Sequence, residues 1–136
     1  MSTTPFFSII TASYNSEKTI SDTITSVLNL DFNDFEYIIV DGNSKDKTVD
    51  IIKSFISKFE AKGITYKFIS EKDKGIYDAW NKGIALSEGQ WISFLGSDDS
   101  YLPSALQLYF NEIEKNKKSS NGYGISTFPF SLIPYH

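Results

Sequence analysis

Short apolar runs alternate along this chain with segments of helical periodicity. Residues 6–10, 35–40, 64–69 and 91–95 are such runs, and each is predicted to be a strand. The first, second and fourth are almost continuously apolar, which is typical of strands that are buried on both faces of a parallel sheet. In the segments that follow them, apolar side chains recur every three or four residues, which predicts helices.

Four helices are predicted from this periodicity. Their apolar positions are, in chain order, Ile20, Ile24, Val27 and Leu28; Val49, Ile52, Ile56 and Phe59; Ile76, Trp80 and Ile84; and Leu102, Leu106, Phe110 and Ile113. Asn15 or Ser16 is the expected N-cap of the first helix, and Gly63 is expected to end the second. Pro103 suits the first turn of the fourth helix.

Strands that alternate with helices indicate parallel pairing through right-handed crossovers. The predicted fold is therefore α/β, a Rossmann-like open and mostly parallel sheet with helices on both faces. Residues 1–118 are expected to form one domain and residues 119–136 an irregular tail. The tail has no charged residue and contains Pro129 and Pro134, so it is interpreted as a truncation or a reading-frame change, with contact to a partner or a membrane as the alternative.

Composition narrows the range of functions. The formal net charge is -4, so no basic excess is present to bind a nucleic-acid backbone. The chain has no cysteine, which excludes thiolate catalysis and zinc–thiolate sites. No signal peptide and no run long enough to span a membrane is recognised. The expected location is cytoplasmic, or at the inner face of the membrane by peripheral association.

Polar segments follow all four predicted strands, at residues 11–15, 41–44, 70–75 and 96–99. In an open parallel sheet, ligands bind outside the carboxyl ends of the strands, so these segments are expected to converge on one site. The chain contains neither G-x-G-x-x-G nor the P-loop pattern. A phosphate ligand would therefore need another source of positive charge.

Two adjacent carboxylates, Asp98 and Asp99, could bind a cation that supplies this positive charge. A hard divalent cation takes one or two protein carboxylates, and substrate phosphates complete its coordination shell. The alternative is that this pair forms a turn and an N-cap before the next helix. Asp41 has a similar alternative as an Asx turn with Gly42.

Ser44 and Asp46 are interpreted as caps of the second helix. Lys72 and Lys74 could meet a diphosphate or form an ordinary solvated loop.

Together these segments resemble glycosyltransferase family 2, whose members have the GT-A fold. The resemblance covers about residues 5–116 and rests on FSIITASYNSEKTISDTITSVLN, FEYIIVDGNSKDKTVDIIK and SEKDKGIYDAWNKGIALSEGQWISFLGSDDSYLP. The block ISEKDKGIYDAWNKGI resembles a subgroup associated with bacterial surface-polysaccharide assembly. The resemblance implies a nucleoside-diphosphate sugar as donor, with a UDP-sugar favoured, and Mn²⁺ or Mg²⁺ as cofactor.

The resemblance also implies roles for individual residues, which we carry over position by position. Nucleotide-sugar binding falls to Thr11, Ala12, Ser13, Asp41, Asp73, Lys74 and Asp98. In this group, residues 11–13 line the pocket for base and ribose, and Asp41 receives the base edge. The metal falls to Asp98 and Asp99, without a decision on which of the two binds it.

The implied reaction is inverting transfer to a glycan or lipid-linked acceptor. Two departures from the family stand out: Gly96 occupies a position that is acidic in many members, and the catalytic base expected downstream has no counterpart here. The alternative is therefore an inactive fragment that binds nucleotide and metal, so sugar transfer is expected to be weak or absent. A receiver-like signalling domain is disfavoured, because its acidic pair would follow the first strand.

Overall fold

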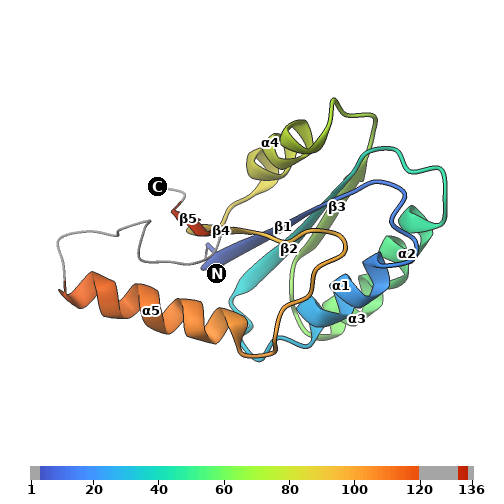
Figure 1. The fold of residues 1–136 in the computed structure, drawn as a ribbon. Coiled ribbons are helices and arrows are strands. Elements are labelled where there is room, and N and C mark those ends of the chain that lie inside the picture. The colour runs from blue at the N-terminus through green and yellow to red at the C-terminus, as the bar shows by residue number, and fades with distance from the viewer. Residues whose placement is uncertain (1–3, 120–131, 135–136) are drawn as a thin grey trace.

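The computed structural model describes residues 4–119 and 132–134. Its sheet has five strands in the order β3-β2-β1-β4-β5 (Figure 1). The strands are β1 (Phe7–Ser13), β2 (Phe35–Asp41), β3 (Tyr66–Ser70), β4 (Trp91–Phe94) and β5 (Leu132–Pro134). The first four are mutually parallel, and β5 pairs antiparallel with β4. The predicted Rossmann-like, mostly parallel sheet is confirmed.

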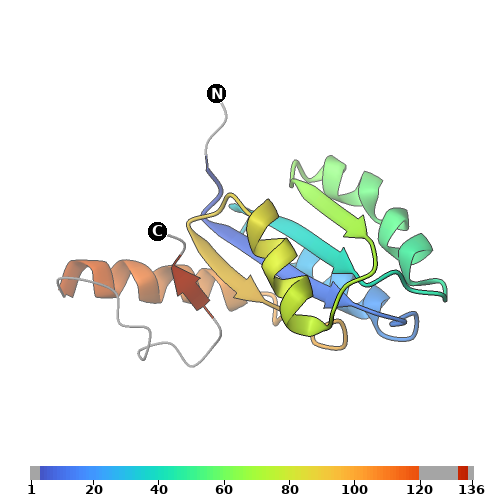
Figure 2. The same ribbon diagram turned by 90° about the horizontal axis from the view of Figure 1, so that it is seen from above.

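Helices cover both faces of this sheet, as predicted. They are α1 (Ile20–Leu28), α2 (Thr48–Ser54), α3 (Ile56–Ala61), α4 (Ile76–Leu86) and α5 (Ala105–Ser119). Helix α4 lies alone on one face, and the other four lie on the opposite face, as Figure 2 shows from above. Within the described part of the chain, no helix is long and apolar enough to cross a membrane.

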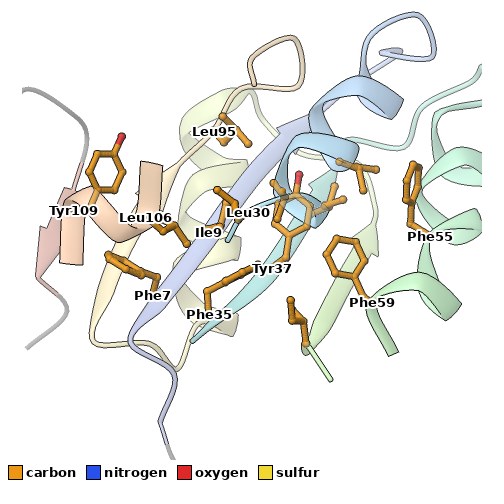
Figure 3. Packing of buried hydrophobic residues seen from close by; sticks show 14 of the residues in the cluster. Phe7, Ile9, Leu30, Phe35, Tyr37, Phe55, Phe59, Leu95, Leu106 and Tyr109 are labelled. Atoms are coloured by element: carbon orange, nitrogen blue, oxygen red, sulfur yellow. The ribbon is translucent and has the colours of Figure 1, made fainter. Parts of the chain in front are cut away.

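The larger core lies between the sheet and the helices α1, α2, α3 and α5, which cover one of its faces (Figure 3). Alternation along β1 directs Phe7 and Ile9 into this core and Ile10 to the face of α4. Tyr37 is fully buried among these side chains. Burial raises the pKa of its hydroxyl, which shares a hydrogen bond of 2.8 Å with the hydroxyl of Thr11.

Helix α4 packs on the sheet through small residues, so its predicted apolar stripe is wrong at the first position. Ile76 is 55% exposed, whereas Ala79 and Gly83 are buried. A Cβ at Gly83 would lie 2.5 Å from Cγ2 of Ile10. The glycine therefore permits an approach of helix and strand that a larger side chain would prevent.

Three predicted helix boundaries differ from the structure. The second helix is interrupted at Phe55, whose amide donates to the carbonyl of Ile52, three residues back, and so breaks the α-helical ladder. Helix α1 begins after Thr19, and Ser16 contributes its carbonyl oxygen there, without a side-chain cap. Pro103 lies in a turn just before α5 instead of in its first turn.

The expectation of an irregular segment from residue 119 is wrong at residues 132–134. These residues form β5, and Pro134 is in register with Trp91 at the edge of the sheet. An edge strand tolerates proline because one side of its backbone needs no ladder hydrogen bond. The other residues of the predicted irregular tail, 120–131 and 135–136, lie outside the described part of the chain.

Candidate functional site

The carboxyl ends of the parallel strands surround an open cleft of about 510 Å³, which we call the strand-end cleft. Its lining comes from the end of β1, from the segments that follow the four parallel strands, and from helix α4. The predicted convergence of the strand-end segments is thus confirmed. The lining residues are Ala12, Ser13, Tyr14, Gly42, Lys72, Asp73, Gly75, Ile76, Ala79 and Ser97. Of the predicted nucleotide-binding residues, Ala12, Ser13 and Asp73 are among them. Thr11 is fully buried beneath the cleft instead.

Asp41 is fully buried at the end of β2, and its carboxylate accepts four hydrogen bonds. One oxygen, Oδ1, accepts from the hydroxyls of Ser13 (2.8 Å) and Ser44 (2.6 Å). The other, Oδ2, accepts from the amide of Ser44 and the hydroxyl of Ser70, both at 2.8 Å. All four donors are neutral, and together they tie the ends of β1, β2 and β3 to one carboxylate. A base edge would reach Asp41 only by replacing one of them.

The prediction that Ser44 caps the second helix is wrong, because its hydroxyl and amide both bind Asp41. Asp46 does act at the start of that helix, since its carboxylate accepts from the amide and the hydroxyl of Thr48. Desolvation raises the pKa of Asp46, but the hydrogen bonds from Thr48 and from the amide of Glu17 outweigh it and lower the pKa overall. The contact of Ser44 with Asp41 is local, since the two are three residues apart, whereas no local pattern marked Ser70, which reaches Asp41 from strand β3.

Asp73 lies over Gly42, across the cleft from β1. A Cβ added at Gly42 would lie 2.9 Å from Oδ2 of Asp73, so the glycine leaves room for this carboxylate. The other oxygen of Asp73 accepts from the amide of Gly75 at 3.0 Å. Lys72 lines the cleft, whereas the predicted Lys74 is exposed and is not among the lining residues.

The acidic segment after β4 presents two exposed carboxylates, those of Asp98 and Asp99. Both approach Gly96: a Cβ there would lie 2.7 Å from Oδ2 of Asp99 and 3.2 Å from Oδ1 of Asp98. Two converging, exposed carboxylates fit a hard divalent cation whose remaining ligands come from a phosphate and water. Within the described ranges no group of three or more acidic, histidine or cysteine side chains could hold a metal by itself. A cation at this position would therefore depend on ligand oxygens.

A second hollow of about 540 Å³ adjoins the strand-end cleft at Ser97. Its lining consists of Asn15, Ser16, Glu17, Lys18, Thr19, Asp46, Ser97 and Asp98. The hydroxyls of Ser16 and Ser97 lie 3.0 Å apart and form the boundary between the two spaces. Asp98 thus faces the second hollow, while Asp73 faces the first.

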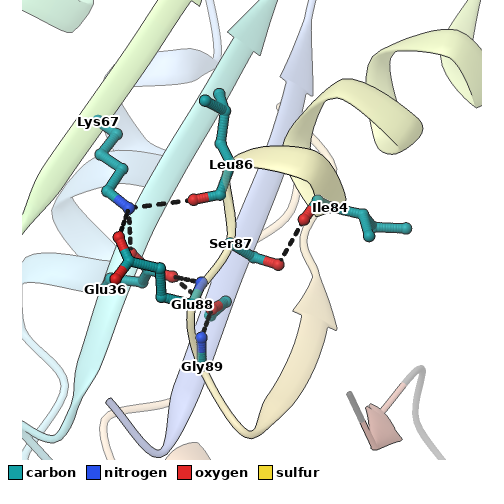
Figure 4. Close-up of polar contacts among 8 residues, drawn as sticks. Glu36, Lys67, Ile84, Leu86, Ser87, Glu88 and Gly89 are labelled. Carbon is teal, nitrogen blue, oxygen red and sulfur yellow. Dashed lines mark hydrogen bonds and ion pairs between the residues drawn. The ribbon is translucent and has the colours of Figure 1, made fainter. Parts of the chain in front are cut away.

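A different polar cluster lies at the amino ends of the strands (Figure 4). Glu36, 2% exposed, accepts from the hydroxyl of Ser8 and the amide of Glu88, each at 2.6 Å. Lys67 lies 2.9 Å from the carboxylates of both Glu36 and Glu88. Desolvation lowers the pKa of Lys67, but these two carboxylates outweigh it and raise the pKa overall. No pattern in the sequence predicted this cluster.

The fold and the site together define an open α/β domain with a polar cleft outside the carboxyl ends of its parallel strands. The family model of "Glycosyl transferase family 2" matches residues 8–130. The chain therefore belongs to glycosyltransferase family 2, and the resemblance found in its sequence is confirmed. The match extends to residue 130, so the expectation that residues 119–136 do not match the family is wrong as far as that residue.

Two relatives and one solved structure illustrate this membership. The chain is 38% identical over 96 residues to a PGL/p-HBAD biosynthesis glycosyltransferase of Mycobacterium bovis, covering 71% of this chain and 36% of the relative. It is 35% identical over 123 residues to the putative teichuronic acid biosynthesis glycosyltransferase TuaG of Bacillus subtilis, covering 89% and 48%. This chain thus spans less than half the length of these relatives.

The solved structure is S. aureus TarS 1-349 in complex with UDP-GlcNAc. It superposes with a TM-score of 0.75 at 26% identity, covering 88% of this chain and 36% of that one. The neighbour therefore shares the GT-A arrangement of sheet and helices over most of the present chain.

Proposed function

We propose that this chain binds the nucleoside-diphosphate sugar of a glycosyltransferase, with a divalent cation, in the strand-end cleft. The observation that carries the proposal is the placement of three carboxylates at two strand ends: Asp73 lines the strand-end cleft, Asp98 lines the adjoining hollow, and Asp99 approaches Gly96 together with Asp98. It is supported by the family membership and by the UDP-GlcNAc bound to the TarS neighbour.

The residues that line the cleft offer groups that suit a nucleoside and a diphosphate. Tyr14, 60% exposed, lines the cleft beside Ala12 and Ser13 and offers an aromatic face to a base. Stacking of a base on an aromatic side chain contributes about 1–3 kcal/mol. Lys72 supplies the one cationic side chain among the lining residues of this cleft.

Asp98 and Asp99 are the residues that would hold Mn²⁺ or Mg²⁺. When bound, such a cation acts as a Lewis acid and stabilises the charge that develops on the diphosphate. The protein's own contribution is to hold both carboxylates exposed at one strand end. Asp73, over Gly42, then limits where the nucleotide can lie.

We further propose that the reaction is inverting transfer to a glycan or lipid-linked acceptor in bacterial surface-polysaccharide synthesis. TuaG, whose name refers to teichuronic acid, supports this assignment. A carboxylate base must assist the acceptor hydroxyl in such a transfer. The proposed location is the cytoplasm, at the inner membrane face where the acceptor is lipid-linked.

Calorimetric titration with UDP, with and without Mn²⁺, tests donor binding. Binding is expected to be much tighter with the metal than without it, and this tightening is expected to be lost in Asp98→Ala and Asp99→Ala. Asp50→Ala is the matched control, because Asp50 is an exposed carboxylate on α2 outside both hollows. A folded, monomeric sample that binds neither UDP, GDP nor dTDP in the presence of Mn²⁺ would contradict the proposal.

A further inference from the structure

The acidic segment after β4 is held in place from helix α1. Thr23 is 1% exposed, and its hydroxyl lies 3.0 Å from the carbonyl oxygen of Ser97 and 2.7 Å from that of Asp99. These two carbonyls flank Asp98 in the chain. One buried hydroxyl, which has a single hydrogen to donate, therefore draws both sides of the acidic pair toward the helix.

A second anchor follows one turn along the same helix. The amide of Tyr101 donates to the hydroxyl of Ser26 at 3.1 Å, and that hydroxyl donates to the carbonyl of Thr23 at 2.7 Å. The hydroxyl of Tyr101 is hydrogen-bonded to that of Ser93 in β4. The backbone after the acidic pair is thus fixed to both α1 and the sheet.

The carboxylates themselves have no such support. Across residues 4–119 and 132–134, no hydrogen-bond donor contacts the side-chain oxygens of Asp98 or Asp99 in this structure, and both residues are exposed. Two like charges on adjacent residues repel each other. Because nothing holds the side chains directly, their convergence on Gly96 depends on the path of the backbone.

We propose that Thr23 is a positioning residue that sets the acidic pair for its divalent cation. The proposal rests on the proposed function, since it presumes that Asp98 and Asp99 bind the cation. Residues that orient metal ligands through hydrogen bonds, without binding the metal themselves, affect metal affinity by about 10–100-fold. Thr23 acts in this way through the backbone of residues 97–99, without touching the cation or the nucleotide.

Thr23→Val tests this role, because valine keeps the shape of threonine and lacks its hydroxyl. The dissociation constant for UDP is measured by calorimetry with and without Mn²⁺. We expect the tightening produced by Mn²⁺ to fall about tenfold in this variant, while UDP binding without metal is unchanged. Thr23→Ser, which keeps the hydroxyl, should restore most of the metal dependence.

Thr25→Val is the matched control, since it makes the same change at an exposed position of the same helix. General destabilisation of α1 would weaken binding with and without Mn²⁺ alike, so the ratio of the two constants isolates the positioning role. Should Thr23→Val fail to fold, Ser26→Ala removes the second anchor, and a smaller fall in the ratio is expected.

The outcomes separate this inference from the proposed function. An unchanged ratio in Thr23→Val, or in Ser26→Ala where Thr23→Val does not fold, overturns the positioning role alone. An unmodified chain that is folded and shows no Mn²⁺-dependent binding of UDP overturns the proposed function, and the positioning role with it.

Discussion

Strand β2 carries two buried carboxylates, one near each end, and the two have different kinds of partner. Glu36, at the amino end, lies 2.9 Å from the ammonium group of Lys67. Asp41, at the carboxyl end, accepts hydrogen bonds only from serine hydroxyls and one backbone amide. The negative charge of Glu36 is thus compensated by the ammonium group of Lys67. The carboxylate of Asp41 is stabilised only by neutral hydrogen-bond donors, so its negative charge is not compensated by a positive one.

The difference separates a structural end of the sheet from the end at which we propose that the nucleotide sugar binds. At the amino end, Lys67 bridges Glu36 and Glu88 and also donates to the carbonyl of Leu86 at 3.0 Å. At the carboxyl end, Asp98 and Asp99 present charge that no described cationic side chain pairs with. Negative charge that the chain leaves uncompensated is available to a bound cation, as the proposed function requires.

The largest effect is expected from Lys67→Met, which would leave the buried carboxylate of Glu36 without its cation. Breaking a buried pair by removal of one partner costs about 3–5 kcal/mol. The free energy of unfolding, measured by urea titration, should fall by that amount. UDP binding by the folded fraction should stay unchanged, because Lys67 lies at the opposite end of the sheet from the strand-end cleft.

The double variant Glu36→Gln, Lys67→Met provides the control, because it removes both charges together. It should recover much of the lost stability, since no uncompensated charge then remains in the interior. A loss below about 1 kcal/mol in Lys67→Met would mean that Lys67 behaves as a surface ion pair. The contrast between the two ends of β2 would then fail.

Two glycines give the next largest effect and sharpen the same contrast. A Cβ at Gly89 would meet backbone, 2.7 Å from the amide nitrogen of Ser8, while one at Gly42 would meet only the side chain of Asp73, at 2.9 Å. Gly89→Ala should therefore cost about 1–3 kcal/mol of stability. Gly42→Ala should change stability by less than about 0.5 kcal/mol and weaken UDP binding, because Asp73 must move.

Urea titration and calorimetry of both variants measure the two effects side by side. The converse result would reverse the assignment of the two ends: Gly89→Ala weakening UDP binding at unchanged stability, with Gly42→Ala unfolding the chain.

The fold was largely predictable because its signals are local. Buried parallel strands are near-continuous apolar runs, and β1, β2 and β4 each contain one. The errors arose where tertiary contacts override periodicity. Ile76 fits a helical stripe, yet it is exposed because α4 meets the sheet through Ala79 and Gly83. The short strand β5 was not predicted because its formation depends on the edge offered by β4.

The site was predictable only as far as its segments could be placed. The position of each polar segment after a strand indicated that they would converge, and Ala12, Ser13 and Asp73 do line the cleft. The residues that support the site could not be found in this way. Thr23 is separated by 74 and 76 residues from the carbonyls that it binds. Ser70 likewise reaches Asp41 from a neighbouring strand.

The smallest effect concerns the pH dependence of the amino-end cluster. The hydrogen bond from Lys67, together with its positive charge, lowers the pKa of the Glu88 carboxyl below its ordinary value of 4.5. A carboxyl whose pKa is lower in the folded chain stabilises that chain above the ordinary pKa, and the contribution is lost as the pH falls through the folded pKa. The unmodified chain should therefore be slightly more stable than Glu88→Gln near neutral pH, and the difference should vanish in acid.

Thermal unfolding of both chains between neutral pH and about pH 3 measures this difference across the relevant titration. The effect is expected to be small because the Glu88 side chain is 71% exposed and solvent screens its pairing with Lys67. Salt at about 1 M, where the Debye length is about 3 Å, should reduce the difference further. A difference in stability that persists unchanged in acid would show that Glu88 acts through packing or a neutral hydrogen bond. The charge of Lys67 would then stabilise the fold only through its ion pair with Glu36.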